Sequence, residues 1–135
     1  MNGNHKKIKL PGMKFKVITP LMETNDLQGT ISFYSEILGF TLRNTFEHEG
    51  ITVWCSLYKD EIDIMFSLPN REMNYGRILL SGSLYIYLDG VDEFWEKIKD
   101  KVEVVYPPEN FEYEMREFAI KDNNGYVLNF GESTI

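Results

Sequence analysis

Residues 115–131, MREFAIKDNNGYVLNFG, decide the fold. An alternating run, Met115–Lys121, is followed by the turn DNNG at 122–125 and by a second run at 126–130. Because Asn and Gly tolerate positive φ, this pattern predicts a β-hairpin with a short polar loop.

The same plan occurs earlier in the chain. Residues 53–58 run into Lys59-Asp60-Glu61, and residues 62–66 return, so both hairpins carry Lys-Asp at the turn. The repetition indicates one supersecondary unit that is used twice.

The residues before each hairpin complete that unit. Asp26 is a suitable N-cap for a helix at 27–38, and Gly39 lies where a left-handed C-cap is expected. In the first unit we predict a strand at 15–24, a helix at 27–38 and a strand at 40–47 before the hairpin. In the second unit we predict a strand at 83–88, a helix at 91–100 and a strand at 102–106.

Two proline positions predict irregularities. Pro20 lacks a backbone donor, so the strand at 15–24 should lie at a sheet edge. Pro107 and Pro108 should end the strand at 102–106 and begin a loop at 109–113.

These elements predict an α+β fold made of two βαβββ modules. At 135 residues the chain has the size of one domain. We expect an N-terminal tail at 1–13, a single domain at 14–135 with modules at about 14–68 and 82–132, and a linker at 69–81.

The amino-acid composition limits the kinds of molecule that this chain is expected to bind. The formal charge of −7 argues against nucleic acid, whose phosphates need a basic face, and weakly favours a cationic small molecule. No apolar run is long enough for a membrane span, and the N-terminus lacks the apolar region of a secretory signal. The single Cys55 fits a reducing compartment. We therefore expect a cytoplasmic protein with no membrane partner.

Alternation gives each strand two different faces. Ile64 and Phe66 oppose Asp63 and Met65, and the strands at 83–88 and 126–130 divide in the same way. One face is aliphatic and suits packing under a helix. The other is polar and aromatic, as a concave binding surface would be.

The chain resembles the vicinal oxygen chelate superfamily, which includes glyoxalase I, extradiol dioxygenases and bleomycin-resistance proteins. The resemblance spans about residues 14–132 and rests on these matches: Asp26-Leu27, Ser32-Phe33-Tyr34 and Leu38-Gly39-Phe40 in the first half, and Glu117-Phe118-Ala119-Ile120 with Asp122-Asn123-Asn124-Gly125-Tyr126 in the second. Asn123 replaces the usual proline of the second motif. The resemblance implies two βαβββ modules whose mixed sheets curl around a cleft, often completed by dimerisation.

The metal enzymes of that family carry His or Glu ligands on the first and last strands of each module. The corresponding positions here are Thr19, Met65, Ser83 and Asn129. These are poor ligands for Zn²⁺, Ni²⁺ or Fe²⁺. His5 and His48 lie in the tail and in a turn. We expect no metal, no cofactor and no catalytic residues.

This pattern resembles the bleomycin-resistance branch, which binds cationic drugs in aromatic clefts of a dimer. The resemblance implies a homodimer that binds a small aromatic or cationic molecule in a metal-free cleft, with a possible role in antibiotic resistance. The predicted ligand-binding residues are Glu23, Trp54, Asp63, Met65, Tyr85, Tyr87, Phe118 and Asn129, and Thr19 and Leu21 would share their face.

Other interpretations remain open at this stage. Trp54 fits a core or a dimer interface as well as a ligand platform, and Glu23 and Asp63 fit solvated strand positions. The alternative function is a lyase, isomerase or dioxygenase of the same superfamily, with an atypical metal site or with Glu23 and Asp63 as acid–base groups. A third is a structural module whose cleft is filled by its own Tyr and Trp side chains.

Overall fold

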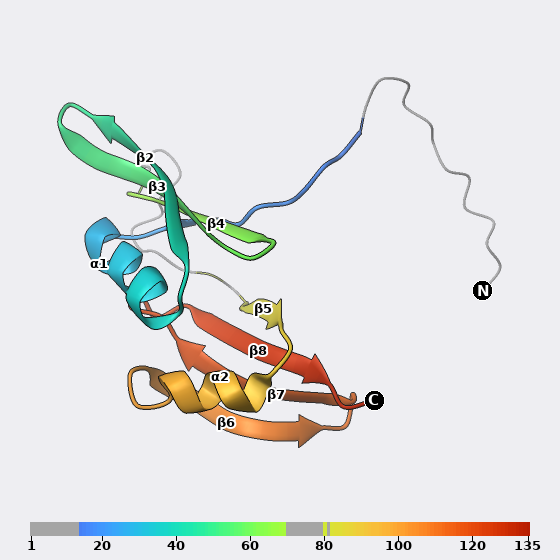
Figure 1. Cartoon of the computed structure of the whole chain (residues 1–135). Helices are drawn as coiled ribbons and strands as arrows, with labels where there is room; N and C mark the ends of the chain where they lie inside the picture. The colour runs from blue at the N-terminus through green and yellow to red at the C-terminus, as the bar shows by residue number, and fades with distance from the viewer. Residues whose placement is uncertain (1–13, 70–79, 81) are drawn as a thin grey trace.

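The computed structural model of the chain describes residues 14–69, 80 and 82–135. The predicted tail at 1–13 and nearly all of the predicted linker at 69–81 lie outside these residues. Two four-stranded mixed sheets make up the fold (Figure 1). Sheet A has the order β1-β4-β3-β2, and sheet B has the order β5-β8-β7-β6.

The two sheets share one topology, which confirms the predicted fold class. In each, the first strand pairs in parallel with the last, and the remaining neighbours are antiparallel. The strands of sheet A are β1 (Leu21–Glu23), β2 (Thr41–His48), β3 (Ile51–Lys59) and β4 (Ile62–Ser67). Those of sheet B are β5 (Leu84–Tyr87), β6 (Glu103–Phe111), β7 (Met115–Lys121) and β8 (Val127–Ser133). Neither sheet closes into a barrel.

In the first module the predicted caps delimit the helix. The Asp26 side chain accepts a hydrogen bond from the Gly29 amide at 2.9 Å, and α1 (Leu27–Ser32) continues as the π-helical turn η1 (Phe33–Ile37). Gly39 has φ +82°, the left-handed conformation that glycine accepts without strain.

The first strand is much shorter than predicted. β1 occupies only Leu21–Glu23. The Pro20 carbonyl still accepts from the Met65 amide of β4, and the residues before it run away from the sheets in an extended path (Figure 1). This segment exposes Phe15, Val17 and Ile18 by 91%, 78% and 95%.

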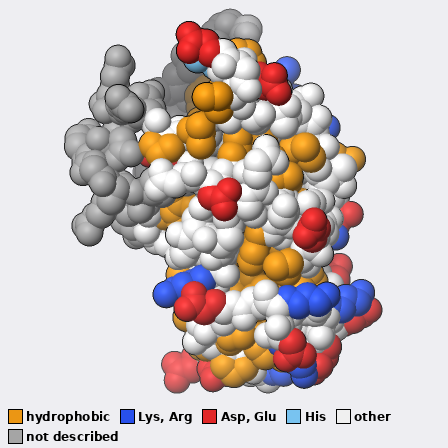
Figure 2. Space-filling view, turned by 90° about the vertical axis from the view of Figure 1, so that its left-hand side faces the viewer, with side chains coloured by type: hydrophobic (Ala, Val, Ile, Leu, Met, Phe, Trp, Pro, Cys, Tyr) orange, Lys and Arg blue, Asp and Glu red, His pale blue; other side chains and the backbone are white. Residues whose placement is uncertain are grey.

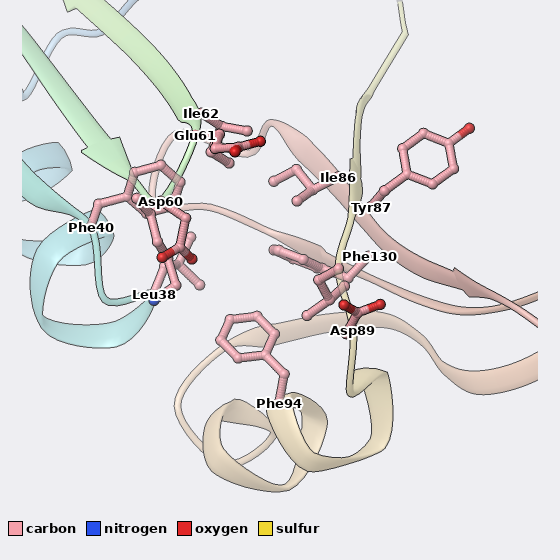
Figure 3. Close-up of a pocket in the computed structure, with 12 residues that line it drawn as sticks. Leu38, Phe40, Asp60, Glu61, Ile62, Ile86, Tyr87, Asp89, Phe94 and Phe130 are labelled. Atoms are coloured by element: carbon pink, nitrogen blue, oxygen red, sulfur yellow. The ribbon is translucent and has the colours of Figure 1, made fainter.

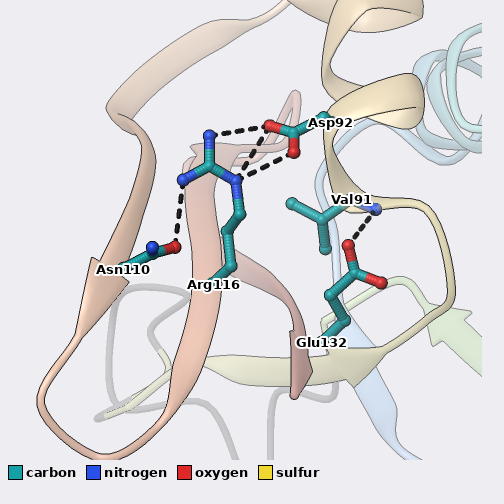
Figure 4. Close-up of polar contacts among 5 residues, drawn as sticks. All are labelled: Val91, Asp92, Asn110, Arg116 and Glu132. Carbon is teal, nitrogen blue, oxygen red and sulfur yellow. Dashed lines mark hydrogen bonds and ion pairs between the residues drawn. The ribbon is translucent and has the colours of Figure 1, made fainter. Parts of the chain in front are cut away.

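In the second module, sheet B holds the N-terminal end of α2 (Val91–Ile98). The Glu132 carboxylate accepts hydrogen bonds from the Gly90 and Val91 amides, each at 3.1 Å. A negative group in this position stabilises the helix dipole. Arg116 of β7 meets Asp92 of α2 at 2.9–3.0 Å and also donates to Asn110 (Figure 4).

The predicted loop at 109–113 is wrong, because β6 continues through Pro107 and Pro108 to Phe111. The pairing of β6 with β7 shifts register between Tyr106 and Glu109. β6 is also the edge strand of sheet B, so a missing donor on its outer side breaks no ladder.

The cores of the two modules are continuous. Tyr34 packs against Phe40 and Phe66 in the first module, and Phe94 and Trp95 of α2 pack against Phe118 in the second. Buried residues of both sheets belong to one cluster. On the side of the molecule seen in Figure 2, hydrophobic side chains form separate groups between acidic and basic ones.

A buried polar contact joins the modules. The Tyr34 hydroxyl of η1 donates to Asp122 Oδ2 in the β7–β8 turn at 2.8 Å, and Asp122 Oδ1 accepts from the amides of Asn124 and Tyr126. Burial raises the pKa of Asp122, and these hydrogen bonds offset only part of that effect. Beside them, Asn124 Oδ1 accepts from the Thr24 hydroxyl at 2.7 Å.

Tyr34→Phe should lower the free energy of unfolding by about 1–3 kcal/mol, because it leaves a buried carboxylate oxygen of Asp122 without its donor. Urea denaturation measures the change. Tyr58→Phe is the matched control, since the Tyr58 hydroxyl makes no hydrogen bond within the described part of the chain. Equal stability of the two variants would contradict a structural role for the Tyr34–Asp122 contact.

Candidate functional site

Each sheet has one face that packs on the core and one that no helix of the described chain covers. In sheet B, Phe118, Leu128 and Phe130 point to the core, so alternation places Glu117 and Asn129 on the opposite face. We call the two uncovered surfaces the helix-free face of sheet A and the helix-free face of sheet B.

Glu117 lies at the centre of the helix-free face of sheet B and is only 2% exposed. Three tyrosine hydroxyls donate to its carboxylate. Tyr85 of β5 and Tyr113 of the β6–β7 turn each donate to Oε1 at 2.7 Å, and Tyr106 of β6 donates to Oε2 in a short hydrogen bond. We call Glu117, Tyr85, Tyr106 and Tyr113 the Glu117 cluster.

The cluster fixes the protonation of its members. Burial alone would raise the pKa of Glu117, but the hydrogen bonds from the three tyrosines outweigh it and hold that pKa below its usual range. Burial and the hydrogen bond to Glu117 raise the pKa of Tyr106 to about 12, and the pKa of Tyr85 rises further for the same reasons. At neutral pH the cluster therefore carries one negative charge.

Two buried polar atoms on the helix-free faces have no hydrogen-bond partner within the described residues: Asn129 Oδ1 on sheet B and Ser56 Oγ on sheet A. The Asn129 amide nitrogen donates to the Tyr106 hydroxyl at 2.8 Å, which leaves its oxygen as a free acceptor beside the Glu117 cluster. Orphaned buried polar atoms are uncommon, and they often mark a place where another molecule binds.

Tyrosine rings form the exposed part of the same face. The ring centroids of Tyr85 and Tyr87 lie 4.9 Å apart, and the two residues are 37% and 75% exposed. Both line a hollow of about 390 Å³ between β4 and β5. Its other lining residues include Asp63 of β4, Val17 and Ile18 of the extended segment, and the core-side residues Ile64, Leu84 and Leu128.

A second hollow, of about 440 Å³, lies between the modules (Figure 3). Leu38 and Phe40 of the first module face Ile86, Phe94 and Phe130 of the second across it. Its charged groups lie at Lys59 of β3, on the β3–β4 turn and at Asp89, and no member of the Glu117 cluster lines it.

The structure distributes the predicted ligand residues over both sheets. Tyr85, Tyr87 and Asn129 lie on sheet B, and the hollow beside β5 brings Asp63 to the two tyrosines. Asp63 is also paired with Arg43 at 3.2 Å. Glu23, Trp54 and Met65 lie on sheet A, where Leu21 pairs with Met65.

The placement of Phe118 in the cleft is wrong. Phe118 is completely buried in the core, where its ring packs against Phe94, Trp95 and Phe130. Its neighbour Glu117 occupies the helix-free face instead. Alternation along β7 puts these two neighbours on opposite faces of sheet B.

Sequence reasoning missed the Glu117 cluster. The alternation of Phe118 and Ile120, both apolar, could have placed Glu117 opposite them. No sequence signal pointed to Tyr106 and Tyr113, because the two prolines hid the continuity of β6. Asn129 was predicted, but without its link to Glu117.

The strand positions at which the metal enzymes of the resembled family carry His or Glu ligands hold other residue types here. In sheet A the parallel pairing of β1 with β4 matches Leu21 with Met65, and in sheet B that of β5 with β8 matches Tyr85 with Asn129. The first-strand positions are therefore Leu21 and Tyr85, and not Thr19 and Ser83 as the sequence predicted. A leucine, a methionine and an asparagine are poor ligands for Zn²⁺ or Ni²⁺. Within the described residues, no group of three or more His, Cys, Asp or Glu side chains is arranged to hold a metal ion.

A sequence profile of the family described as Glyoxalase/Bleomycin resistance protein/Dioxygenase superfamily matches residues 18–130. No curated protein matches the chain. In the part of the chain that the structure describes, no helix is long and apolar enough to cross a membrane.

Solved structures share the fold at low sequence identity. TioX from Micromonospora sp. ML1 is 14% identical, with a TM-score of 0.71 over 88% of this chain and 99% of that one. TnmS3, an antibiotic binding protein from Streptomyces sp. CB03234, is 18% identical, with a TM-score of 0.70 over 90% and 98%. A glyoxalase/bleomycin resistance protein/dioxygenase from Nocardioides is 16% identical, with a TM-score of 0.67 over 90% and 85%.

Glu117→Gln should make the protein less sensitive to acid. Because the folded pKa of Glu117 lies below its unfolded value, the ionised carboxylate contributes stability above the unfolded pKa of about 4.3, and this contribution is lost as the pH falls through the folded pKa. The stability advantage of the wild type over Glu117→Gln, measured by urea denaturation, should therefore shrink between pH 7 and about pH 3.5. An unchanged difference would contradict the ionised state of Glu117.

Proposed function

The chain belongs to the Glyoxalase/Bleomycin resistance protein/Dioxygenase superfamily, and we propose that within it the chain binds a small aromatic or cationic molecule in a metal-free cleft. Its character is that of the bleomycin-resistance branch, and the proposal includes a cytoplasmic role in antibiotic binding. A free, buried Cys55 suits a reducing compartment.

The observation that carries this proposal is the tyrosine-lined face of sheet B. Exposed Tyr85 and Tyr87 offer flat surfaces for stacking, and the buried Glu117 carboxylate, which accepts from Tyr85, gives the face a negative charge. TnmS3, which shares the fold, is described as an antibiotic binding protein. This agrees with a binding role for the same fold here.

The residue chemistry favours binding over catalysis. A general acid or base works best with a pKa near the operating pH. In the Glu117 cluster the pKa of the carboxylate is lowered and those of the tyrosines are raised, so both move away from neutrality. Metal-assisted chemistry would need ligands that the positions on β1, β4, β5 and β8 do not supply.

A homodimer forms part of this proposal. β1 and β5 are the outer strands of their sheets, and the extended segment before β1 exposes Phe15, Val17 and Ile18. Edge strands and exposed apolar side chains of this kind pair readily with another chain. Pairing β1 of one copy with β5 of the other would bring the helix-free faces of sheet A and sheet B to opposite walls of one cleft.

Binding can be tested with flat probes. Wild-type protein is titrated with 2-naphthamide and 2-naphthamidine, and with cyclohexanecarboxamide as the non-aromatic control, by isothermal titration calorimetry. Saturable binding of at least one naphthyl probe, and not of the cyclohexyl compound, is expected. Tyr87→Ala should weaken that binding by roughly fivefold to tenfold through the loss of one stacking contact.

The matched control is Ile51→Ala, which removes an exposed apolar side chain at the far end of the β2–β3 hairpin. This control should bind the probe like the wild type. If no naphthyl probe binds the wild type, or if Tyr87→Ala and Ile51→Ala bind equally, the proposed face is not the binding site.

The dimer predicts a mass of two chains in sedimentation equilibrium. Ile18→Asp should shift the protein toward one chain, because it places a charge on the apolar segment that would be buried against the partner. Ile135→Asp, at a residue 90% exposed at the C-terminus, should leave the mass unchanged. A wild type of single-chain mass at micromolar concentration would rule out the dimer.

A further inference from the structure

We propose that Glu117 makes the helix-free face of sheet B selective for a positively charged hydrogen-bond donor that is attached to a flat ring. This inference rests on the proposed function, because it concerns the same face, and it names the ligand chemistry and the residue that selects it.

The first argument is charge. Glu117 is almost fully buried, and no Lys, Arg or His of the described chain lies within ion-pair distance of it. The neighbouring Arg116 points to the opposite face, where it is bound to Asp92 (Figure 4). The Glu117 charge is therefore stabilised only by neutral groups, and a cation that approaches this face would be attracted through a poorly solvated region.

The second argument is hydrogen-bond polarity. A tyrosine hydroxyl has one hydrogen, and Tyr85, Tyr106 and Tyr113 all direct theirs at Glu117. The amide group of Asn129 donates to Tyr106, so its free oxygen remains as an acceptor. The polar groups buried beneath this face are therefore acceptors with one negative charge, so the face favours positively charged ligands over carboxylates or phosphates.

The third argument is the position of the rings. Tyr85 and Tyr87 lie on one side of the carboxylate, with ring centroids 4.9 Å apart. On the side of the β6–β7 turn, Tyr113 stacks on Phe111 with centroids 5.4 Å apart and an interplanar angle of 11°. A ligand cation near Glu117 would therefore also meet aromatic faces, which attract positive charge.

Gly131 keeps this arrangement in place. A Cβ at this position would lie 2.2 Å from the Tyr85 hydroxyl oxygen, so only glycine lets the Tyr85 ring cross β8 and reach Glu117. Gly131 leaves room for Tyr85, and the hydrogen bond to Glu117 orders its ring before any ligand binds, which reduces the ordering that binding requires.

Three isosteric probes test the selectivity: 2-naphthamidine, a permanent cation with N–H donors; neutral 2-naphthamide; and anionic 2-naphthoate. On wild-type protein at pH 7, we expect the amidine to bind about tenfold or more tightly than the amide, since a charge-assisted contact is stronger than a neutral one. We expect 2-naphthoate to bind least.

Glu117→Gln should remove most of the preference for the amidine over the amide, and the ratio of the two affinities is the quantity to compare with the wild type. Glu103→Gln is the control, because it removes a carboxylate of the same sheet from an exposed position on β6 and changes the net charge equally. Near-ultraviolet circular dichroism checks that each variant is folded.

A measurement on the wild type complements these variants. As the pH falls through the lowered pKa of Glu117, the affinity for the amidine should fall toward that of the amide, because Glu117 becomes protonated while the amidinium stays charged. Gly131→Ala should also weaken amidine binding, because the added methyl group displaces Tyr85.

The outcomes separate this inference from the proposed function. Binding of naphthyl probes with no preference for the amidine, or a preference that Glu117→Gln and Glu103→Gln reduce equally, overturns the role of Glu117 and leaves the binding face intact. Failure of every naphthyl probe to bind the wild type rejects the proposed function and this inference with it.

Discussion

The buried contact between Tyr34 and Asp122 is the constraint on which the rest of the structure depends. It ties the first helix to the turn of the last hairpin, two segments 88 residues apart in the chain. Asp122 also organises its own turn by accepting the amides of Asn124 and Tyr126. One carboxylate therefore shapes the hairpin and docks the modules, at the energetic cost of burying a charged group.

Docking through this contact determines which surfaces remain available. The apolar faces of both sheets merge into one core, so the polar and aromatic faces are left outward. The edges at β1 and β5 and the extended segment before β1 are left outward as well. The apolar faces of the sheets therefore stabilise the fold, and the helix-free faces stay open to other molecules.

A hydrogen-bonded cluster occupies the centre of the helix-free face of sheet B. Tyr85 and Asn129 stand opposite each other on the parallel strands where the family's metal enzymes carry ligands, and both connect to the Glu117 cluster. Three hydroxyl dipoles keep a carboxylate ionised in a position that water hardly reaches. Such an arrangement is organised before a ligand arrives, and its pKa values suit recognition rather than proton transfer.

The sequence by itself determined the elements and their repetition. The signals that predicted them act through neighbouring residues: period-two alternation, the Asp26 cap, Gly39 and the DNNG turn. Local rules were therefore sufficient to predict the elements of both modules and the aliphatic face of β4, β5 and β8. The tertiary structure decided the rest. The edge position of β6 and its register shift between Tyr106 and Glu109 allowed Pro107 and Pro108 to stay in a strand. The cluster draws side chains from β5, β6, the β6–β7 turn and β7, and the contact between residues 85 and 117 exists only because β8 lies between their strands and carries a glycine there. No local pattern encodes that proximity, since it arises from how the strands are ordered in space.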